Sequence, residues 1–226
     1  CFAADLAQPG YGDEWIVLAQ SARGDRSAAA AYWESLCQAV SAGQGQLNAR
    51  RSTETSRALL AVAAIGRDGR DVGGYDLTAP LRDASFAAAQ GLNGTIFALL
   101  ALDAGAWPAR ARANYIAAIC DAQLADGGWA MGSSAADADL TAMALQALAP
   151  YRRQARVSAA VEAGLRCLSG LQQADGGFAS WGTANCESCA QVILALCQLG
   201  LPLPDTRFVK NGHTVLDAML RYHVGG

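Results

Sequence analysis

The chain has 226 residues, of which 52% are hydrophobic and 16% charged, with a formal net charge of −3. This slight acidity argues against a nucleic-acid partner, because phosphate binding needs a basic face. No apolar run approaches the roughly 18 residues of a membrane helix, and no charged-then-apolar signal peptide opens the chain. A cytoplasmic protein and a mature or excised segment both remain open.

Five segments are apolar on nearly every face and end just before glycine or proline. They cover residues 15–22, 56–65, 95–104, 140–149 and 188–199, with Gly24, Gly66, Gly105, Pro150 and Gly200 at their ends. Glycine and proline are expected just past a helix C-terminus. A helix that is apolar all round must be surrounded, so these segments predict five inner helices.

Four other segments mix charge with an apolar stripe, which predicts outer helices with one solvated face. They cover residues 27–42, 109–123, 155–172 and 213–223. Residues 66–91 are rich in glycine and charge, so a long loop and a short turn of helix are expected there. Strand signals are nearly absent. The alternation predicts an all-α barrel of two layers, and a solenoid of helix pairs is the alternative.

A Gly-Gly-aromatic element recurs at residues 73–75, 127–129 and 176–178, and the chain ends on Gly225-Gly226. The second glycines are 54, 49 and 49 positions apart (74 to 128, 128 to 177, 177 to 226). A repeat of this length is typical of stacked helical units. Gln123 and Gln172 precede two of the copies and are expected to bond backbone groups at helix ends.

The segments Gln123–Trp129 and Gln172–Phe178 resemble the Gln-Trp repeat of squalene and other terpenoid cyclases and of prenyltransferase β subunits. Across most of the chain the similarity is closer to bacterial, usually secreted, prenyltransferase-like repeat proteins. The segments that carry it are residues 12–15, 72–77, 91–94 with 97–99, 139–143 with 146–148, and 211–212. The resemblance implies a single α/α toroid domain of α6/α6 type over residues 1–226, on an extracellular or cell-surface protein.

In this repeat an aromatic residue and another buried helix would follow Gly226. We therefore expect an excised or truncated domain with five of six inner helices, from a parent chain with other domains; a natural terminal cap is the alternative. The same toroid serves cobalamin carriers and complement thioester domains. The thioester signature, a Cys-Gly-Glu-Gln run, is absent.

The run from Asp137 to Ala142 resembles the Asp-x-Asp-Asp-Thr-Ala motif of squalene-type cyclases, whose middle carboxylic acid protonates an alkene. The resemblance implies Asp139 as the acid, with Asp137 beside it, in an enzymatic alternative. Leu140 replaces the next aspartate, however, and those enzymes use two helical domains. An aspartate at a helix start also caps the helix and favours its dipole. No catalytic residue is therefore predicted for the preferred, non-enzymatic interpretation.

The other inner helices also start with polar residues, namely Asp13-Glu14, Thr53-Glu54, Asn93 and Glu187. Capping explains each one singly. In a toroid these starts converge at one end, which predicts an acidic ring near aromatic side chains that can bind a cation, a sugar or an amine. The candidate ligand-binding residues are Glu14, Glu54, Tyr75, Asn93, Trp129, Asp139, Trp181 and Glu187.

Seven cysteines cannot all pair within the chain. Cys186 and Cys189 have a spacing seen in metal sites and lie at a helix start, where a thiolate is favoured. A structural zinc needs four ligands, and no second pair exists. Two packed thiols are expected, with a disulfide or redox pair as the alternative. No metal and no cofactor are predicted.

The sequence thus predicts a non-catalytic module that binds a ligand or partner, or serves a structural role, with a polar, acidic barrel mouth. Its partner is an unknown small molecule or surface partner. The first alternative is an isoprenoid-acting enzyme, similar to a terpenoid cyclase or prenyltransferase. The second is a binding domain similar to a cobalamin carrier.

Overall fold

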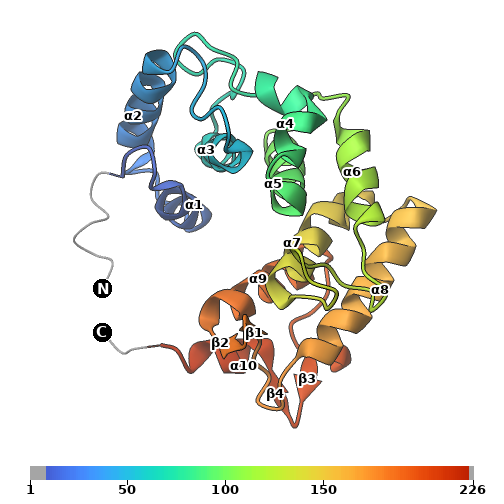
Figure 1. The fold of residues 1–226 in the computed structure, drawn as a ribbon. Coiled ribbons are helices and arrows are strands. Elements are labelled where there is room, and N and C mark those ends of the chain that lie inside the picture. Colours follow the sequence, from blue (N-terminus) through green and yellow to red (C-terminus); the bar gives the residue numbers. More distant parts are fainter. Residues whose placement is uncertain (1–8, 224–226) are drawn as a thin grey trace. The chain divides into compact units, whose positions relative to one another are not determined.

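The structure, a computed structural model, describes residues 9–223 and divides the chain into two compact units, residues 1–115 and 116–226. It is mostly helical, with ten α-helices among the described residues (Figure 1), which confirms the all-α class. The two-layer toroid and the single domain stay predictions. The last glycine pair, Gly225-Gly226, lies outside the described residues. None of the described helices is long and apolar enough to cross a membrane.

The first unit contains five complete helices and the start of a sixth. They are α1 (Glu14–Ala22), α2 (Ala29–Ala42), α3 (Ser52–Ala64), α4 (Ala84–Ala88), α5 (Gly91–Ala104) and α6 (Arg112–Asp121), with a 3₁₀ helix η1 (Ala79–Arg82) before α4. The boundary of the units falls within α6, after Tyr115. These bounds agree with the expected inner and outer segments, and η1 and α4 supply the short helical turn expected between residues 66 and 91.

Helix α3 lies between α1 and α5 in this unit (Figure 1). Its Leu59 and Val62 are fully buried, as are Leu99 and Leu102 of α5. This burial agrees with the expectation that apolar helices are surrounded. Helix α1 departs from it, because Trp15 is 52% exposed.

The second unit contains four helices besides the end of α6. They are α7 (Ala138–Leu148), α8 (Ala155–Leu171), α9 (Cys186–Gln198) and α10 (Val215–Leu220), with 3₁₀ helices η2 (Ala149–Tyr151) and η3 (Thr206–Phe208). Two hairpins of two-residue strands pair β1 (Ala179–Ser180) with β2 (Thr183–Ala184) and β3 (Val209–Lys210) with β4 (His213–Thr214). Helix α7 packs against α8 and α9, and α10 packs against α9 (Figure 1).

The expected outer helix over residues 213–223 is therefore shorter than its pattern suggested. Residues 213 and 214 form strand β4, and Thr214 caps α10 by accepting the N–H of Asp217 at 3.1 Å. Asp217 in turn accepts the N–H of Thr214, which completes a capping box. The helix starts where this box forms and ends at Leu220, so the amphipathic pattern over-extended it at both ends.

Two copies of the repeat have the same construction in the second unit. Gln123 Nε2 donates to the carbonyl oxygens of Gly127 and Ala160, at 2.7 and 2.8 Å. Gln172 Nε2 donates to those of Gly176 and Phe208, both at 2.9 Å. Each glutamine thus closes its own glycine turn and holds a segment far along the chain, which confirms the predicted backbone bonds.

Candidate functional site

The eight candidate residues divide evenly between the two units. The first unit holds Glu14, Glu54, Tyr75 and Asn93, and the second holds Trp129, Asp139, Trp181 and Glu187. The acidic ring that would join all of them stays a prediction.

Glu14 is a buried carboxylate at the start of α1, only 1% exposed. Its Oε1 accepts the N–H of Gly12 at 2.9 Å and the hydroxyl of Tyr32 at 3.4 Å. Burial, followed by the negative charge of Glu14, raises the pKa of Tyr32, so this phenol stays a hydrogen-bond donor. A buried carboxylate requires such donors. Both of these hydrogen-bond donors to Glu14 come from the protein itself.

Glu54 lies in the first turn of α3, with its side chain 19% exposed. It accepts hydrogen bonds from Asn48 Nδ2 at 3.1 Å and from Arg51 Nη1 at 3.3 Å. Glu54 and Glu14 both lie near Tyr11. Burial, and then the negative charges of Glu54 and Glu14, raise the pKa of the Tyr11 phenol. The structure therefore brings these two predicted carboxylates together around one tyrosine.

The cap of α3 comes from an unexpected residue. Gln90 Oε1 accepts the backbone N–H of Thr53 at 2.8 Å and the hydroxyl of Ser52 at 3.0 Å. Thr53 and Glu54, taken from the sequence as the capping residues of this helix start, do not supply the acceptor. A long-range contact between α3 and the residue before α5 performs the capping, and no local pattern signals it.

Tyr75 and Asn93 complete the candidates of the first unit. The Tyr75 side chain is 37% exposed, and its ring packs on Gly45, where an added methyl group would come within 2.7 Å of Cδ1. Gly45 has φ +90°, which an L side chain rarely adopts. Asn93 is half-buried in the first turn of α5.

Asp137 and Asp139 have different environments at the start of α7. Asp137 is the N-cap: its Oδ1 accepts the N–H of Leu140 at 3.0 Å, and its Oδ2 accepts the hydroxyl of Ser180 at 2.7 Å. The capping explanation therefore holds for Asp137. The Oδ1 atom of Asp139 is buried and has no hydrogen-bond partner within residues 9–223. Of the two aspartates, Asp139 is therefore the one with a carboxylate oxygen that no described protein group satisfies.

Trp129 is fully buried, and its Nε1 donates to the carbonyl oxygen of Ile119 at 2.7 Å. Its backbone N–H is also bonded, to Thr141 Oγ1 at 3.0 Å. An indole whose faces and N–H are all occupied has no surface for a ligand. Of the predicted aromatic contacts in the second unit, Trp129 packs inside and Trp181 does not.

Trp181 is 91% exposed and forms the tip of the β1–β2 hairpin together with Gly182. Its φ is +53° and that of Gly182 is +79°, the left-handed pair that a tight two-residue turn requires. Ser180, the residue before it, holds the cap Asp137. This hydrogen bond ties the hairpin to the start of α7. Glu187, in the first turn of α9, is exposed.

The cysteine pair is held as thiols. A hydrogen bond to Glu187 raises the pKa of Cys186, and burial raises that of Cys189, with the charge of Asp139 a weaker contribution. Both pKa shifts run opposite to the thiolate preference of a helix start, because burial and neighbouring carboxylates favour the neutral thiol. Within residues 9–223, no group of three or more His, Cys, Asp or Glu residues is placed to hold a metal ion.

Tyr11, Tyr32 and Ser180 are contacts that the sequence did not reveal. No motif marks these three residues in the sequence. The carboxylate that each one contacts is known only from the folded structure. A buried glutamate such as Glu14 does signal that donors must exist nearby, but burial of Glu14 was not evident from its helix-start position.

Comparison of the chain with protein-family models, with characterised proteins and with solved structures finds no match.

Proposed function

We propose that the chain is a non-catalytic binding module that contacts its ligand through Trp181 and the acidic starts of α7 and α9. The observation that carries the proposal is Trp181 itself, an almost fully exposed indole in a left-handed backbone conformation. Such a conformation costs a bulky residue roughly 1–2 kcal/mol. We infer the contact role from the strained backbone, because residues held in sparsely populated conformations cluster at functional sites.

The β3–β4 hairpin shows which residue this type of turn normally carries, and so allows the conformational cost at Trp181 to be judged. Its tip is Asn211-Gly212, with φ values of +50° and +83°, and asparagine is favoured at this position. The β1–β2 hairpin has the same backbone turn with tryptophan in place of asparagine. Turn formation alone therefore does not account for Trp181.

Carboxylates of the same unit extend the proposed contact surface. Asp139 carries a carboxylate oxygen without a hydrogen-bond partner, and Glu187 is exposed. A ligand that lays a sugar ring or a cationic group on the indole can donate a hydrogen bond to the exposed Glu187. The unpartnered Oδ1 atom of Asp139 is buried beneath this surface. The Ser180–Asp137 bond holds the hairpin in place before binding, which lowers the ordering cost of association.

For the fold we propose the prenyltransferase-like α/α toroid, and for the whole protein a secreted or cell-surface bacterial location. The helix bounds and the two matching glutamine-turn copies support the toroid. The location rests on the resemblance alone.

An isoprenoid-acting enzyme is the second candidate, favoured by the buried, unpartnered oxygen of Asp139. Proton donation to an alkene needs a carboxylic acid shielded from water. Asp137, however, is fully engaged by the helix cap and Ser180, and Leu140 stands where the cyclase motif has another aspartate.

The binding proposal can be tested with a panel of soluble oligosaccharides and with choline, by titration calorimetry. We expect one probe to bind, and Trp181→Asn to weaken it roughly 5- to 150-fold, since stacking contributes on the order of 1–3 kcal/mol. Glu187→Gln should weaken it as well. Tyr222→Ala, which removes another exposed aromatic residue of the same unit, is the matched control. Equal loss in the control, or full affinity in Trp181→Asn, would refute the role of Trp181.

The enzymatic candidate is tested separately. The protein is incubated with squalene or farnesyl diphosphate and the products are analysed by mass spectrometry. Turnover that disappears in Asp139→Asn but persists in Trp181→Asn would favour the enzyme over the binding module.

A further inference from the structure

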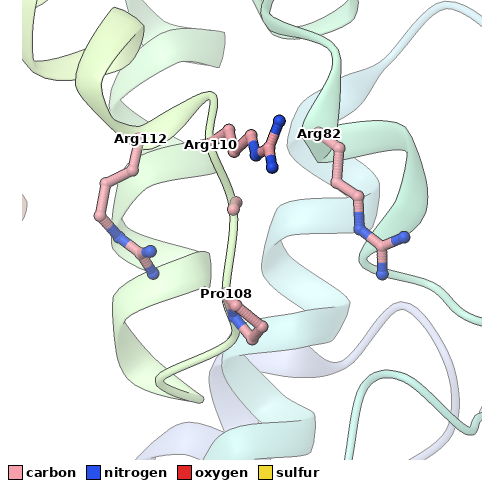
Figure 2. Close-up of a pocket in the computed structure, with 5 residues that line it drawn as sticks. Arg82, Pro108, Arg110 and Arg112 are labelled. Carbon is pink, nitrogen blue, oxygen red and sulfur yellow. The ribbon is translucent and has the colours of Figure 1, made fainter.

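An open hollow of about 670 Å³ lies in the first unit beside the loop that precedes α6 (Figure 2). Its lining residues are Arg82, Pro108, Ala109, Arg110 and Arg112. Small-molecule sites occupy roughly 300–1,000 Å³, so the hollow has the size of such a site. Three of its five lining residues are permanently cationic, in a chain whose net charge is −3.

Arg112 lines this hollow, and three hydrogen bonds hold its side chain in place. Its Nε donates to Asp103 Oδ1 at 2.7 Å, and its Nη2 donates to the carbonyl oxygens of Leu102 and Trp107, at 3.0 and 2.8 Å. These bonds hold the guanidinium plane between the end of α5 and the following loop. Its Nη1 makes no hydrogen bond to the described part of the chain and is available to a ligand.

Arg82, at the end of η1, is also partly compensated. It forms an ion pair with Asp76, and its Nη2 lies 3.4 Å from the Thr78 hydroxyl. The Nε and Nη1 groups have no protein acceptor among residues 9–223. Arg82 is thus positioned by its own loop while retaining donors that can bind an anion.

Arg110 is the uncompensated cation of the group. It is exposed, and none of its five N–H donors has an ion pair or hydrogen bond with the residues that the structure describes. Its side chain extends from the loop in the direction of Arg82 (Figure 2). Because Asp76 and Asp103 offset the other two arginines, the hollow keeps a surplus of one positive charge at Arg110.

We propose that this hollow binds a small molecule carrying a phosphate or sulfate group, with Arg110 as its main contact and Arg82 and Arg112 as flanking donors. The planar guanidinium fork matches two oxygens of such an anion and forms charge-assisted hydrogen bonds. Pro108 and Ala109 give the hollow an apolar wall for the uncharged part of the ligand. The site is independent of the Trp181 surface, so either proposal can fail without the other.

The test uses phenyl phosphate, phenyl sulfate and inorganic phosphate as probes, with binding followed by titration calorimetry in 50 mM NaCl. We expect phenyl phosphate to bind more tightly than inorganic phosphate, because only the former offers a ring to Pro108 and Ala109. Phenyl sulfate distinguishes the two anion classes, since a doubly charged phosphate should bind more tightly than a singly charged sulfate. Higher salt should weaken all three complexes.

Three variants decide the role of Arg110. Arg110→Ala should weaken phenyl phosphate binding at least tenfold, and Arg110→Lys, which keeps the charge but loses the fork, should weaken it several-fold. Arg153→Ala, which removes another exposed arginine without a protein partner in the described residues, should leave affinity unchanged. Absence of binding, equal loss in Arg153→Ala, or full affinity in Arg110→Ala would overturn the proposal. Circular dichroism checks that each variant is folded.

Discussion

Gly164 of α8 lies directly against the ring of Trp129, so closely that an added methyl group would come within 2.7 Å of Cζ3. The same methyl group would lie 3.0 Å from Leu145 Cδ2 of α7. The close packing of α7, α8 and the buried indole therefore depends on the missing side chain at one position.

Replacement of this glycine should destabilise the protein, and another glycine of α8 provides the control. Gly164→Ala should cost about 1–3 kcal/mol of unfolding free energy, the usual cost of overpacking a core. Gly170→Ala has open space around it and should gain roughly 0.5–1 kcal/mol from better helix propensity. Urea unfolding measures both. Equal effects at the two positions would contradict the packing explanation.

Gln172 should be important for stability although it lies in a loop. It is 7% exposed, and its Nε2 is bonded to two backbone carbonyl oxygens, those of Gly176 and Phe208. Gln172→Ala leaves both acceptors without a partner, so we expect a loss of about 2 kcal/mol. Gln173→Ala, at the exposed next position, should change stability by less than about 0.5 kcal/mol. Thermal and urea unfolding of both variants test the difference.

Trp181→Asn should stabilise the fold even if it abolishes ligand binding. Asparagine adopts positive φ at lower cost, so the free energy of unfolding should rise by about 1 kcal/mol. Asn211→Ala in the other hairpin should lower it by more than this, because it removes the favoured residue at positive φ and also the hydrogen bond from Asn211 Nδ2 to the Ala174 carbonyl oxygen. A drop in melting temperature for Trp181→Asn would show that the indole is held by contacts the structure does not contain.

The Asp205 carboxylate should contribute stability that depends on pH. Hydrogen bonds from the side chain and backbone of Arg207 lower the pKa of Asp205 to about 2. An acid whose pKa is lower in the folded state stabilises the protein above its unfolded pKa, about 4, and loses this contribution as the pH falls towards the folded value.

The measurement compares wild type with Asp205→Asn by urea unfolding at a series of pH values. The wild type should be the more stable at pH 7, and the difference should shrink as the pH falls from about 4 towards 2. The other carboxyl groups affect the wild type and Asp205→Asn equally, so their contribution to the pH dependence cancels in the stability difference. A stability difference that does not change with pH would contradict the role of the Asp205 charge.

The sequence predicted most helices well because their apolar periodicity and terminal glycines are local signals. Residues 155–172 were expected as a helix, and α8 covers residues 155–171. The glutamines of the second and third copies of the repeat, Gln123 and Gln172, were correctly given a backbone role. Local signals also failed at α10, where a hairpin and a capping box replace the first part of the expected helix.

The candidate site was less predictable, because its chemistry depends on contacts between distant residues. The motif resemblance favoured Asp139 over Asp137, but it did not show what separates their environments, because Ser180, 43 positions after Asp137, engages only Asp137. Trp129 and Trp181 were both candidate contacts, and only their burial in the folded chain separates them. The sequence did not predict the arginine hollow, because Arg82 ends η1, Arg110 lies in the loop before α6, and neither belongs to a motif.

The amide bridge from Gln123 to Ala160 has a consequence for biosynthesis. Residue 160 is synthesised after the first glycine turn of this unit, so the hydrogen bond that completes this turn cannot form until the later segment has been added to the chain. Each copy of the repeat is thus finished by the segment that follows it, and assembly of the second unit has a direction from its N-terminal to its C-terminal end.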